Sequence, residues 1–394
     1  MRGVSKKHRQ ECLCHYCFLH NFESFSHFPT HSSMASTIDA CSLLDRDTQN
    51  MYEVLRNFPH QVREAIDIGS QAPFFHDKGR FRTLVFSGMG GSAIGGDLVR
   101  CALQGYGVND FMMIVNRGYS LPAGVDNQTA FIASSYSGNT EETLASYRAA
   151  STRTKRRLCI ATGGELAQMA AADNVPLIKI PSGLQPRAAV GYSFCPILLT
   201  LALHGVISPD VRATILHAMH LLPKALDALT ATYSLPNPAQ NPAFALAEKL
   251  KGTIPVFYSA PLLEAANLRW RGQMQENAKQ VAFGNIVPEM NHNEINGWVM
   301  PDAMMKNFSV VFLSSPQTAH DRINLRFDAM RDILRPKVHQ LLEVHTTGKT
   351  LLEEMFAQIL MADWTSYWLA LLNEQDPSEI ADITALKNYM TSKG

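Results

Sequence analysis

The sequence has neither a long hydrophobic run nor an excess of charge of one sign. No apolar run approaches the ~20 residues that a membrane-spanning helix needs, so we expect no membrane span. Lysine and arginine together number 35, as do aspartate and glutamate, and the formal net charge at pH 7 is zero. Without a basic surplus, nothing favours nucleic acid or an anionic membrane as a partner.

Cysteine is scarce as well, with seven residues in the chain. The number is odd, and four of the thiols are widely scattered, at Cys41, Cys101, Cys159 and Cys195. This pattern is typical of reduced thiols in a cytoplasmic protein. The other three, Cys12, Cys14 and Cys17, stand close together, but the Cys14-x-x-Cys17 pair has no second pair at the spacing of a zinc site. The sequence therefore predicts no metal site and no cofactor.

The segment before Met34 has no helical or strand periodicity. Its basic start is not followed by an uninterrupted apolar core or a small-residue cleavage site, which disfavours a secretory signal. Two interpretations remain for residues 1–33: a disordered extension, or an over-long start with Met34 as the true initiator. In both, the segment stands outside the fold.

The sequence has enough apolar residues to form two hydrophobic cores. Hydrophobic residues make up 46% and aromatic residues 9% of a chain of 394 residues, which is longer than one core usually supports. Three prolines at Pro236, Pro238 and Pro242 interrupt the helical patterns and indicate a linker. We therefore expect a first domain over 34–233 and a second over 234–394.

Short apolar strands alternate with helical patterns in both parts, which predicts parallel sheets covered by helices. In the first part we expect strands over 83–86, 111–115, 129–133, 158–161 and 177–180. In the second part we expect strands over 256–259, 310–313 and 338–344. A long helix over 351–372 comes next, with an apolar stripe set by Leu352, Phe356, Ile359 and Leu360. Pro377 is expected to open a last helix at the C-terminus.

A glycine-rich turn comes after the first predicted strand, with Gly88, Gly90, Gly91 and Ser92 before a helix. Free backbone amides at a helix N-terminus suit a phosphate group. The same residues satisfy the loose dinucleotide pattern G-x-G-x-x-A, although the next strand ends in Asn116-Arg117 and not in an acidic residue. An arginine there could read a 2′-phosphate. Glycines that merely permit tight packing are a third explanation.

A second turn makes phosphate binding the favoured explanation. Ser135, Ser137 and Thr140 cluster where the third strand ends, and this strand should lie beside the first. Both helix N-termini would then converge on one anion at the carboxyl edge of the sheet. A hydrogen bond to a charged group contributes roughly 1.5–3 kcal/mol, so three or four suffice to anchor a phosphate. We expect the ligand to be a small sugar phosphate.

At these residues the sequence resembles a known module. Gly90-Gly91-Ser92 and the string S-Y-S-G-N-T-x-E-T at 135–143 resemble the sugar isomerase (SIS) domain. With P-R-A-A at 186–189, E-N-A-K at 276–279, P-E-M-N-H-N-E-I-N-G at 288–297 and D-I-T-A-L-K at 382–387, the chain is similar to the bifunctional phosphoglucose/phosphomannose isomerase family. The similarity extends from about Asp45 onward.

The resemblance implies two SIS-type α/β domains, each a mainly parallel, doubly wound, flavodoxin-like sheet, with a C-terminal helix. It implies an aldose–ketose isomerase acting on glucose 6-phosphate and fructose 6-phosphate. Glu276 would be the base, His292 the ring-opening group, Arg187 the stabiliser of the enediolate, and Lys387 would assist at the ring oxygen. The phosphate would be held by Gly90, Gly91, Ser92, Ser135, Ser137 and Thr140. The family also implies a homodimer in which His292 enters from the other subunit.

Several alternatives stay open on the sequence alone. Glu289 and Glu294 are competing carboxylates, and His292 could simply belong to a helix-capping turn. A non-catalytic phosphosugar sensor needs only the two turns. Where some dual-specificity members carry threonine, this chain has Ile380, so activity on mannose 6-phosphate is implied less directly than activity on glucose 6-phosphate. The zinc-dependent type of phosphomannose isomerase is disfavoured because His292 lacks a second ligand at metal spacing.

Overall fold

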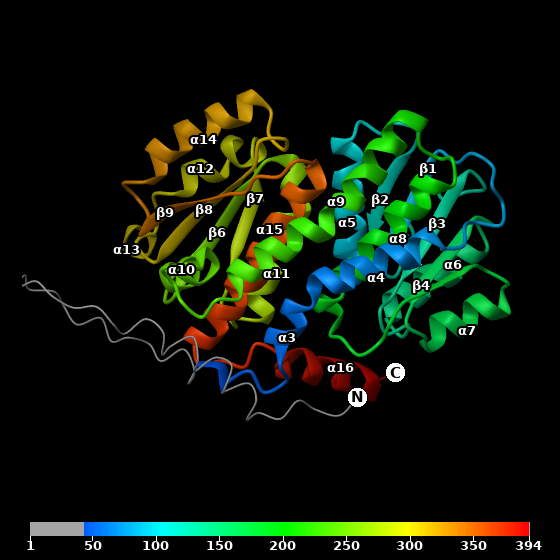
Figure 1. Ribbon diagram of the computed structural model, residues 1–394, viewed down its shortest axis with the longest axis horizontal. Coiled ribbons are helices and arrows are strands. Elements are labelled where there is room, and N and C mark those ends of the chain that lie inside the picture. Colours follow the sequence, from blue (N-terminus) through cyan, green and yellow to red (C-terminus); the bar gives the residue numbers. More distant parts are fainter. Residues whose placement is uncertain (1–42, 394) are drawn as a thin grey trace, which may run out of the picture.

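Two parallel β-sheets lie side by side in the computed structural model, which describes residues 43–393 (Figure 1). The predicted extension over 1–33 and the thiols Cys12, Cys14, Cys17 and Cys41 lie outside the described residues. The α/β fold with two helix-flanked parallel sheets is confirmed. No helix of residues 43–393 is long and apolar enough to cross a lipid bilayer.

The first sheet has the strand order β2-β1-β3-β4-β5, the flavodoxin-like order. Its strands are β1 (Thr83–Ser87), β2 (Met112–Asn116), β3 (Thr129–Ser134), β4 (Arg157–Ala161) and β5 (Leu177–Lys179), each within two residues of its predicted limits. All pairs are parallel, and Ser87 at the end of β1 pairs with Ala133 near the end of β3. The order changes direction between β1 and β3, where ligands enter such sheets.

Helices cover both faces of the first sheet (Figure 1). The helices of residues 43–233 include α3 (Met51–Arg56), α4 (Phe58–Ser70), α5 (Gly90–Gly105), α6 (Glu141–Ser151), α7 (Gly164–Ala172), α8 (Val190–Leu203) and α9 (Pro209–Tyr233). A short 3₁₀ turn, η1 (Pro186–Ala188), joins β5 to α8 and carries the predicted Arg187. Both faces of β3 are buried, as expected for the middle of a covered parallel sheet.

The second sheet has the order β7-β6-β8-β9, which repeats the arrangement of the first four strands of the first sheet. Its strands are β6 (Ile254–Ser259), β7 (Phe283–Ile286), β8 (Phe308–Ser314) and β9 (Gln340–His345). Its helices include α10 (Pro242–Leu250), α11 (Glu264–Glu276), α12 (Glu294–Gly297), α13 (Asp302–Met305) and α14 (Asp321–Leu334). The sequence analysis missed β7 and α10. The edge strand β7 is only four residues long and contains a glycine, so its periodicity is too short to read.

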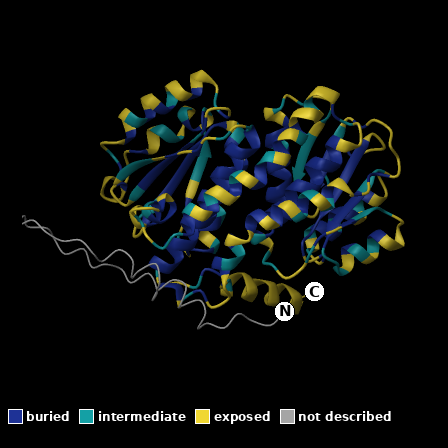
Figure 2. Cartoon of the chain, viewed as in Figure 1, coloured by how far each residue is buried: buried dark blue, intermediate teal, exposed yellow. Residues whose placement is uncertain are grey.

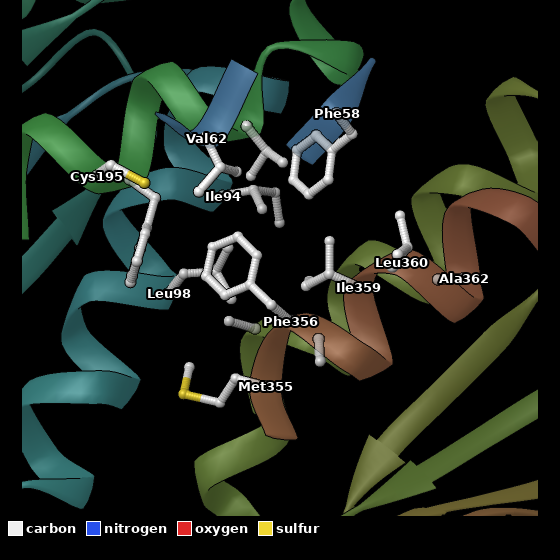
Figure 3. Packing of buried hydrophobic residues seen from close by; sticks show 14 of the residues in the cluster. Phe58, Val62, Ile94, Leu98, Cys195, Met355, Phe356, Ile359, Leu360 and Ala362 are labelled. Atoms are coloured by element: carbon white, nitrogen blue, oxygen red, sulfur yellow. The ribbon is translucent and has the colours of Figure 1, made fainter. Parts of the chain in front are cut away.

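The long helix α15 (Leu351–Leu372) has the predicted limits, and the four residues of its predicted apolar stripe are buried, but so is the rest of the helix. All of its residues are buried, because it runs between the two halves of the molecule (Figure 2). Figure 3 shows Phe356 and Ile359 packed among α4, α5 and α8. The ring of Phe356 lies 4.9 Å from that of Phe194 and 6.3 Å from that of Phe58. This shared core fixes the two sheets relative to each other.

The last helix, α16 (Ala381–Lys393), begins four residues after Pro377, so the prediction that Pro377 opens it is wrong. Pro377 and Ser378 are instead buried in the segment before the helix. None of the residues of α16 is buried (Figure 2), and Leu386 and Tyr389 are 62% and 60% exposed. The helix therefore projects an apolar surface that the rest of residues 43–393 leaves uncovered.

Candidate functional site

The first glycine-rich turn is shaped by close approach to η1. A Cβ on Gly91 would lie 2.4 Å from the carbonyl oxygen of Pro186 and 2.9 Å from the backbone nitrogen of Arg187, so only glycine fits there. Gly90 starts α5 with a φ of 48°, a left-handed value that favours glycine. The amides of Gly90 and Gly91 at the start of α5 remain available for an anion, whereas those of Ser92 and Ala93 donate to the carbonyl oxygen of Met89.

The second turn closes on its own hydroxyl groups. The backbone amide of Gly138 donates to the Ser135 Oγ at 3.1 Å, and this oxygen lies 2.9 Å from the Thr140 Oγ1. Ser137 is exposed and accepts a hydrogen bond from the amide of Asn139 at 3.2 Å. Thr140 is the residue before α6, so the hydroxyls and the N-terminus of α6 lie at one place.

The two turns are in direct contact. The backbone amide of Tyr136 donates to the Ser92 Oγ at 3.1 Å, although the two residues are far apart in the sequence. The hydroxyl of Tyr136 accepts a hydrogen bond from the amide of Leu184 at 3.0 Å, which ties the second turn to the segment before η1. The predicted phosphate-binding residues and the turn that carries Arg187 are therefore neighbours.

Arg187 is 4% exposed, and its guanidinium group is bound on several sides. Its Nε donates to the Asn277 Oδ1 at 2.8 Å, and its Nη2 donates to the carbonyl oxygens of Pro377 at 2.9 Å and Ser378 at 3.2 Å. Burial lowers the pKa of Arg187 below its usual value, and the negative charge of Glu276 opposes this effect. Arginine nevertheless stays protonated in proteins, so the site holds a fixed positive charge.

Glu276 is the last residue of α11 and faces Arg187. Its Oε2 lies 3.5 Å from the Arg187 Nη1, an ion pair without a tight hydrogen bond. The carboxylate side chain is 34% exposed, so a ligand can reach it. A carboxylate that can accept a proton and a cation that can stabilise a developing oxyanion therefore stand together.

A buried polar network holds this pair, and sequence reasoning missed it. Asp363 on α15 accepts from Arg269 Nε and Nη2 at 2.9 and 2.8 Å and from Gln273 Nε2 at 2.8 Å. Arg269 also donates to the carbonyl oxygen of Arg187 at 2.9 Å. Burial raises the pKa of Asp363 above its usual value, and the charge of Arg269 opposes the rise. Asp363 is the only charged residue from 355 to 372, which was a usable signal.

Lys279 lies beside the same pair, and the sequence analysis gave it no role. Its ammonium donates to the carbonyl oxygens of Glu276 at 3.1 Å, of Asn277 at 3.2 Å, and of Asp376. Partial burial, and then the charge of Arg187, lower the pKa of Lys279 to about 8. The lysine joins the end of α11 to the segment before α16.

His292 and Lys387 stand apart from this cluster within residues 43–393. Both side chains are exposed, His292 in the 3₁₀ turn η3 (Glu289–His292) and Lys387 on α16. The competing carboxylates differ: Glu289 is exposed, whereas Glu294 is held by the hydroxyl of Tyr258 and by Asn285 Nδ2, the latter at 2.8 Å. Glu294 therefore fixes the loop that carries His292.

Other candidate sites do not compete with this arrangement. Arg117, which could have read a 2′-phosphate, is paired with the carboxylate of Asp97 on α5. A cavity of about 550 Å³ lies between α11 and β7, against Arg271, Phe283 and Glu294 and away from the two turns. Within the described part of the chain, no group of three His, Cys, Asp or Glu side chains is placed to hold a metal ion.

Comparisons with known proteins concern the family and the fold of the chain. Residues 239–390 match the family described as bacterial phospho-glucose isomerase C-terminal SIS domain. A bifunctional phosphoglucose/phosphomannose isomerase from Caldicellulosiruptor bescii is 37% identical over 351 residues, which are 86% of this chain and 98% of that protein. A protein of the same name from Aquifex aeolicus is 32% identical over 342 residues, or 87% and 98% of the two chains.

A solved structure supports the fold alone. The C-terminal domain of glucosamine-fructose-6-phosphate aminotransferase from Francisella tularensis matches with a TM-score of 0.63 at 13% identity. The match covers 84% of this chain and 98% of that structure. Identity, coverage and fold together confirm the resemblance: the chain belongs to the bifunctional phosphoglucose/phosphomannose isomerase family.

Proposed function

We propose that this protein interconverts glucose 6-phosphate and fructose 6-phosphate, and acts also on mannose 6-phosphate. The observation that carries the proposal is the position of Arg187. Its turn packs against Gly91 of the phosphate-binding turn, and its guanidinium lies 3.5 Å from the carboxylate of Glu276. A sugar held by its phosphate in the first sheet would thus extend toward an acid–base group of the second.

In this proposal the two turns bind the phosphate group of the substrate. The amides of Gly90 and Gly91 and the hydroxyls of Ser92, Ser135, Ser137 and Thr140 would surround the phosphate. Each hydrogen bond to a charged group contributes roughly 1.5–3 kcal/mol, and the N-termini of α5 and α6 add a smaller attraction. The phosphate does not react, so this grip positions the carbon chain.

Proton transfer falls to Glu276 and Arg187. The carboxylate of Glu276 would take the proton from C2 of the open-chain aldose and return it to C1, and the hydroxyl proton of O2 would pass to O1, so that the carbonyl group moves from C1 to C2. The electron pair left by the C2 proton passes to the carbonyl oxygen, and the resulting enediolate would be stabilised by the charge of Arg187. A positioned base of this kind contributes roughly 10²–10⁴-fold to the rate.

Ring opening needs a group that moves a proton from O1 to the ring oxygen O5, and we assign it to His292 with Lys387 assisting. An imidazole can both accept and donate a proton. Both side chains are exposed in the part of the chain that the structure describes. We propose that a second copy of the chain brings His292 to the site, which makes the active protein a homodimer.

A coupled assay with glucose 6-phosphate and mannose 6-phosphate tests the proposal. We expect turnover of both, with glucose 6-phosphate the better substrate. A folded preparation that binds a hexose phosphate in calorimetry but turns over neither substrate would establish the sensor function instead.

A mixing experiment tests the dimer. Glu276→Gln and His292→Ala should each be inactive alone. After unfolding and refolding together, the mixture should regain about a quarter of the wild-type activity, because half of the two-fold dimers then have one intact site. No recovery, with both variants folded, would place His292 and Glu276 in the same subunit.

A further inference from the structure

We propose that Asn277 and Ser366 are positioning residues that hold the guanidinium of Arg187 in its working direction. The inference deepens the proposed function and rests on it. Neither residue is charged, and both are buried: Asn277 is 1% exposed and Ser366 is 0% exposed. Asn277 directly follows Glu276, the last residue of α11, and Ser366 lies on α15 in the core between the sheets.

The hydrogen bonds define which way the Asn277 amide points. The hydroxyl of Ser366 donates to the carbonyl oxygen of Asp363 at 2.9 Å. With its one proton used, the Ser366 oxygen can only accept, and it accepts from the Asn277 Nδ2 at 2.9 Å. The Asn277 Oδ1 must then face the other way, where it accepts from the Arg187 Nε at 2.8 Å. The reversed amide would aim two N–H donors at the N–H of Arg187.

This orientation decides which part of Arg187 meets the substrate. The Nε is bound by Asn277, and the Nη2 is bound by the carbonyl oxygens of Pro377 and Ser378. These are neutral acceptors, so they fix the planar group without neutralising its charge. The Nη1 is left facing the Glu276 carboxylate at 3.5 Å. Asn277 therefore directs the Arg187 Nη1 toward the place where the enediolate oxyanion would form during proton transfer.

The proposal predicts a remote effect on catalysis. In Ser366→Ala the Asn277 Nδ2 loses its acceptor, so the amide is held only through its contact with the Arg187 Nε and is freer to rotate. The guanidinium is then held less firmly at Nε and shifts. Because misplacing a catalytic group by about 1 Å can cost 10²-fold, we expect kcat to fall by about tenfold or more in Ser366→Ala and by about 100-fold in Asn277→Ala. KM should stay within about twofold, since the phosphate-binding turns are unchanged.

Thr365→Val is the matched control. Thr365 is the neighbouring residue on α15, is equally buried, and its Oγ1 has no hydrogen-bond partner within the described residues. This substitution removes a buried hydroxyl from the same helix but not from the network. We expect a kcat within about twofold of the wild type.

The decisive measurement is a double-mutant cycle on kcat with hexose phosphate. Once Asn277 is alanine, there is no amide left to orient, so adding Ser366→Ala should cause no further loss. A merely structural role would instead give additive losses and a matching fall in Ser366→Ala and Thr365→Val. Either of those results, or a full kcat in Ser366→Ala, overturns the proposal.

If the double variant does not fold, the single variants still test the positioning role. Ser366→Ala and Thr365→Val are then compared directly, with circular dichroism and thermal melting to show that both are folded. An inactive wild type would refute the proposed function, and the positioning role with it. An active wild type with an unaffected Ser366→Ala refutes the positioning role alone.

Discussion

The two sheets share a strand order but differ in the turns that leave their first strands. After β1, the chain turns through Gly88–Gly91 and leaves the amides of Gly90 and Gly91 at the start of α5 open. After β6, it turns through Ala260 and the 3₁₀ turn η2 (Pro261–Leu263) into α11. The first turn of α11 holds Glu264, whose carboxylate accepts from the Arg100 Nη2 of α5 at 2.6 Å. Glu264 thus pairs with a side chain of the first half, and the turn after β6 lacks the glycines of the turn after β1.

The comparison indicates a division of labour. The first sheet supplies open amides and hydroxyls, which suit binding of an anion. The second sheet supplies the far end of α11, where Glu276 and Asn277 meet Arg187. Substitutions in the first sheet should therefore act mainly on substrate affinity, and substitutions at the end of α11 mainly on kcat.

The largest effect is expected for Glu276→Gln. The amide cannot take the C2 proton, so kcat should fall by at least roughly 10²–10⁴-fold. Hexose phosphate affinity should stay within a few-fold, because the phosphate grip lies in the other sheet. The coupled assay and calorimetry measure the two quantities. A variant that retains activity would show that another group is the base.

Gly91→Ala should change KM more than kcat, the reverse of what we expect for Glu276→Gln. The new Cβ would meet the backbone of Pro186 at 2.4 Å, so the phosphate-binding turn must shift away from η1. We expect KM to rise by about tenfold or more, the equivalent of about 1.4 kcal/mol, with a smaller change in kcat. Gly118→Ala is the control, because a Cβ there meets nothing within 4 Å. Equal effects in both variants would contradict the special role of the close approach.

Ile380→Thr tests specificity and should act more weakly. Ile380 is half-buried and stands two residues after Ser378, which binds Arg187. A hydroxyl there restores the residue that some dual-specificity relatives carry. One added hydrogen bond of about 0.5–1.5 kcal/mol should raise the ratio of mannose to glucose 6-phosphate turnover by about threefold. An unchanged ratio would show that position 380 does not select between the epimers.

Lys279→Met should have the smallest effect, on stability and its pH dependence. The pKa of Lys279 is about 8 in the folded protein against an ordinary value of 10.5. Between these values the unfolded chain holds more protons, so this group makes folding more favourable as the pH rises. From pH 8 to 10.5, the stability of the wild type relative to the variant should grow by about 0.5 kcal/mol, a small value because the side chain stays accessible. Urea unfolding at several pH values measures it, and a falling difference would contradict the assignment.

Much of the fold could be predicted because strong local patterns recur. The buried strands of the first sheet are continuous apolar runs. β1 and β3 are neighbours, as expected from the proposal that the two turns bind one anion. The pattern failed where tertiary packing decides. One apolar stripe does not reveal that α15 is surrounded by protein on every side. The four-residue β7 forms only because β6 provides a hydrogen-bonding partner.

The candidate site was predictable in part for the same reason. Arg187 and Glu276 stand in sequence strings typical of a family, and the structure brings them together. The residues that hold them were not predictable from local pattern. Asp363 and Ser366 come from α15, and their contacts with α11 and the residue after it span about ninety residues of sequence. Partners this distant are created by the fold, so a local pattern could only flag Asp363 as an odd charge in an apolar helix.

A crystal structure with a bound hexose 6-phosphate tests the central claim most directly. The account predicts that the phosphorus atom lies between the two turns, bound by Ser92, Ser135 and Thr140, with C2 about 3–3.5 Å from the Glu276 carboxylate. A phosphate bound elsewhere, or a sugar whose C2 lies closer to another carboxylate such as Glu294, would contradict it.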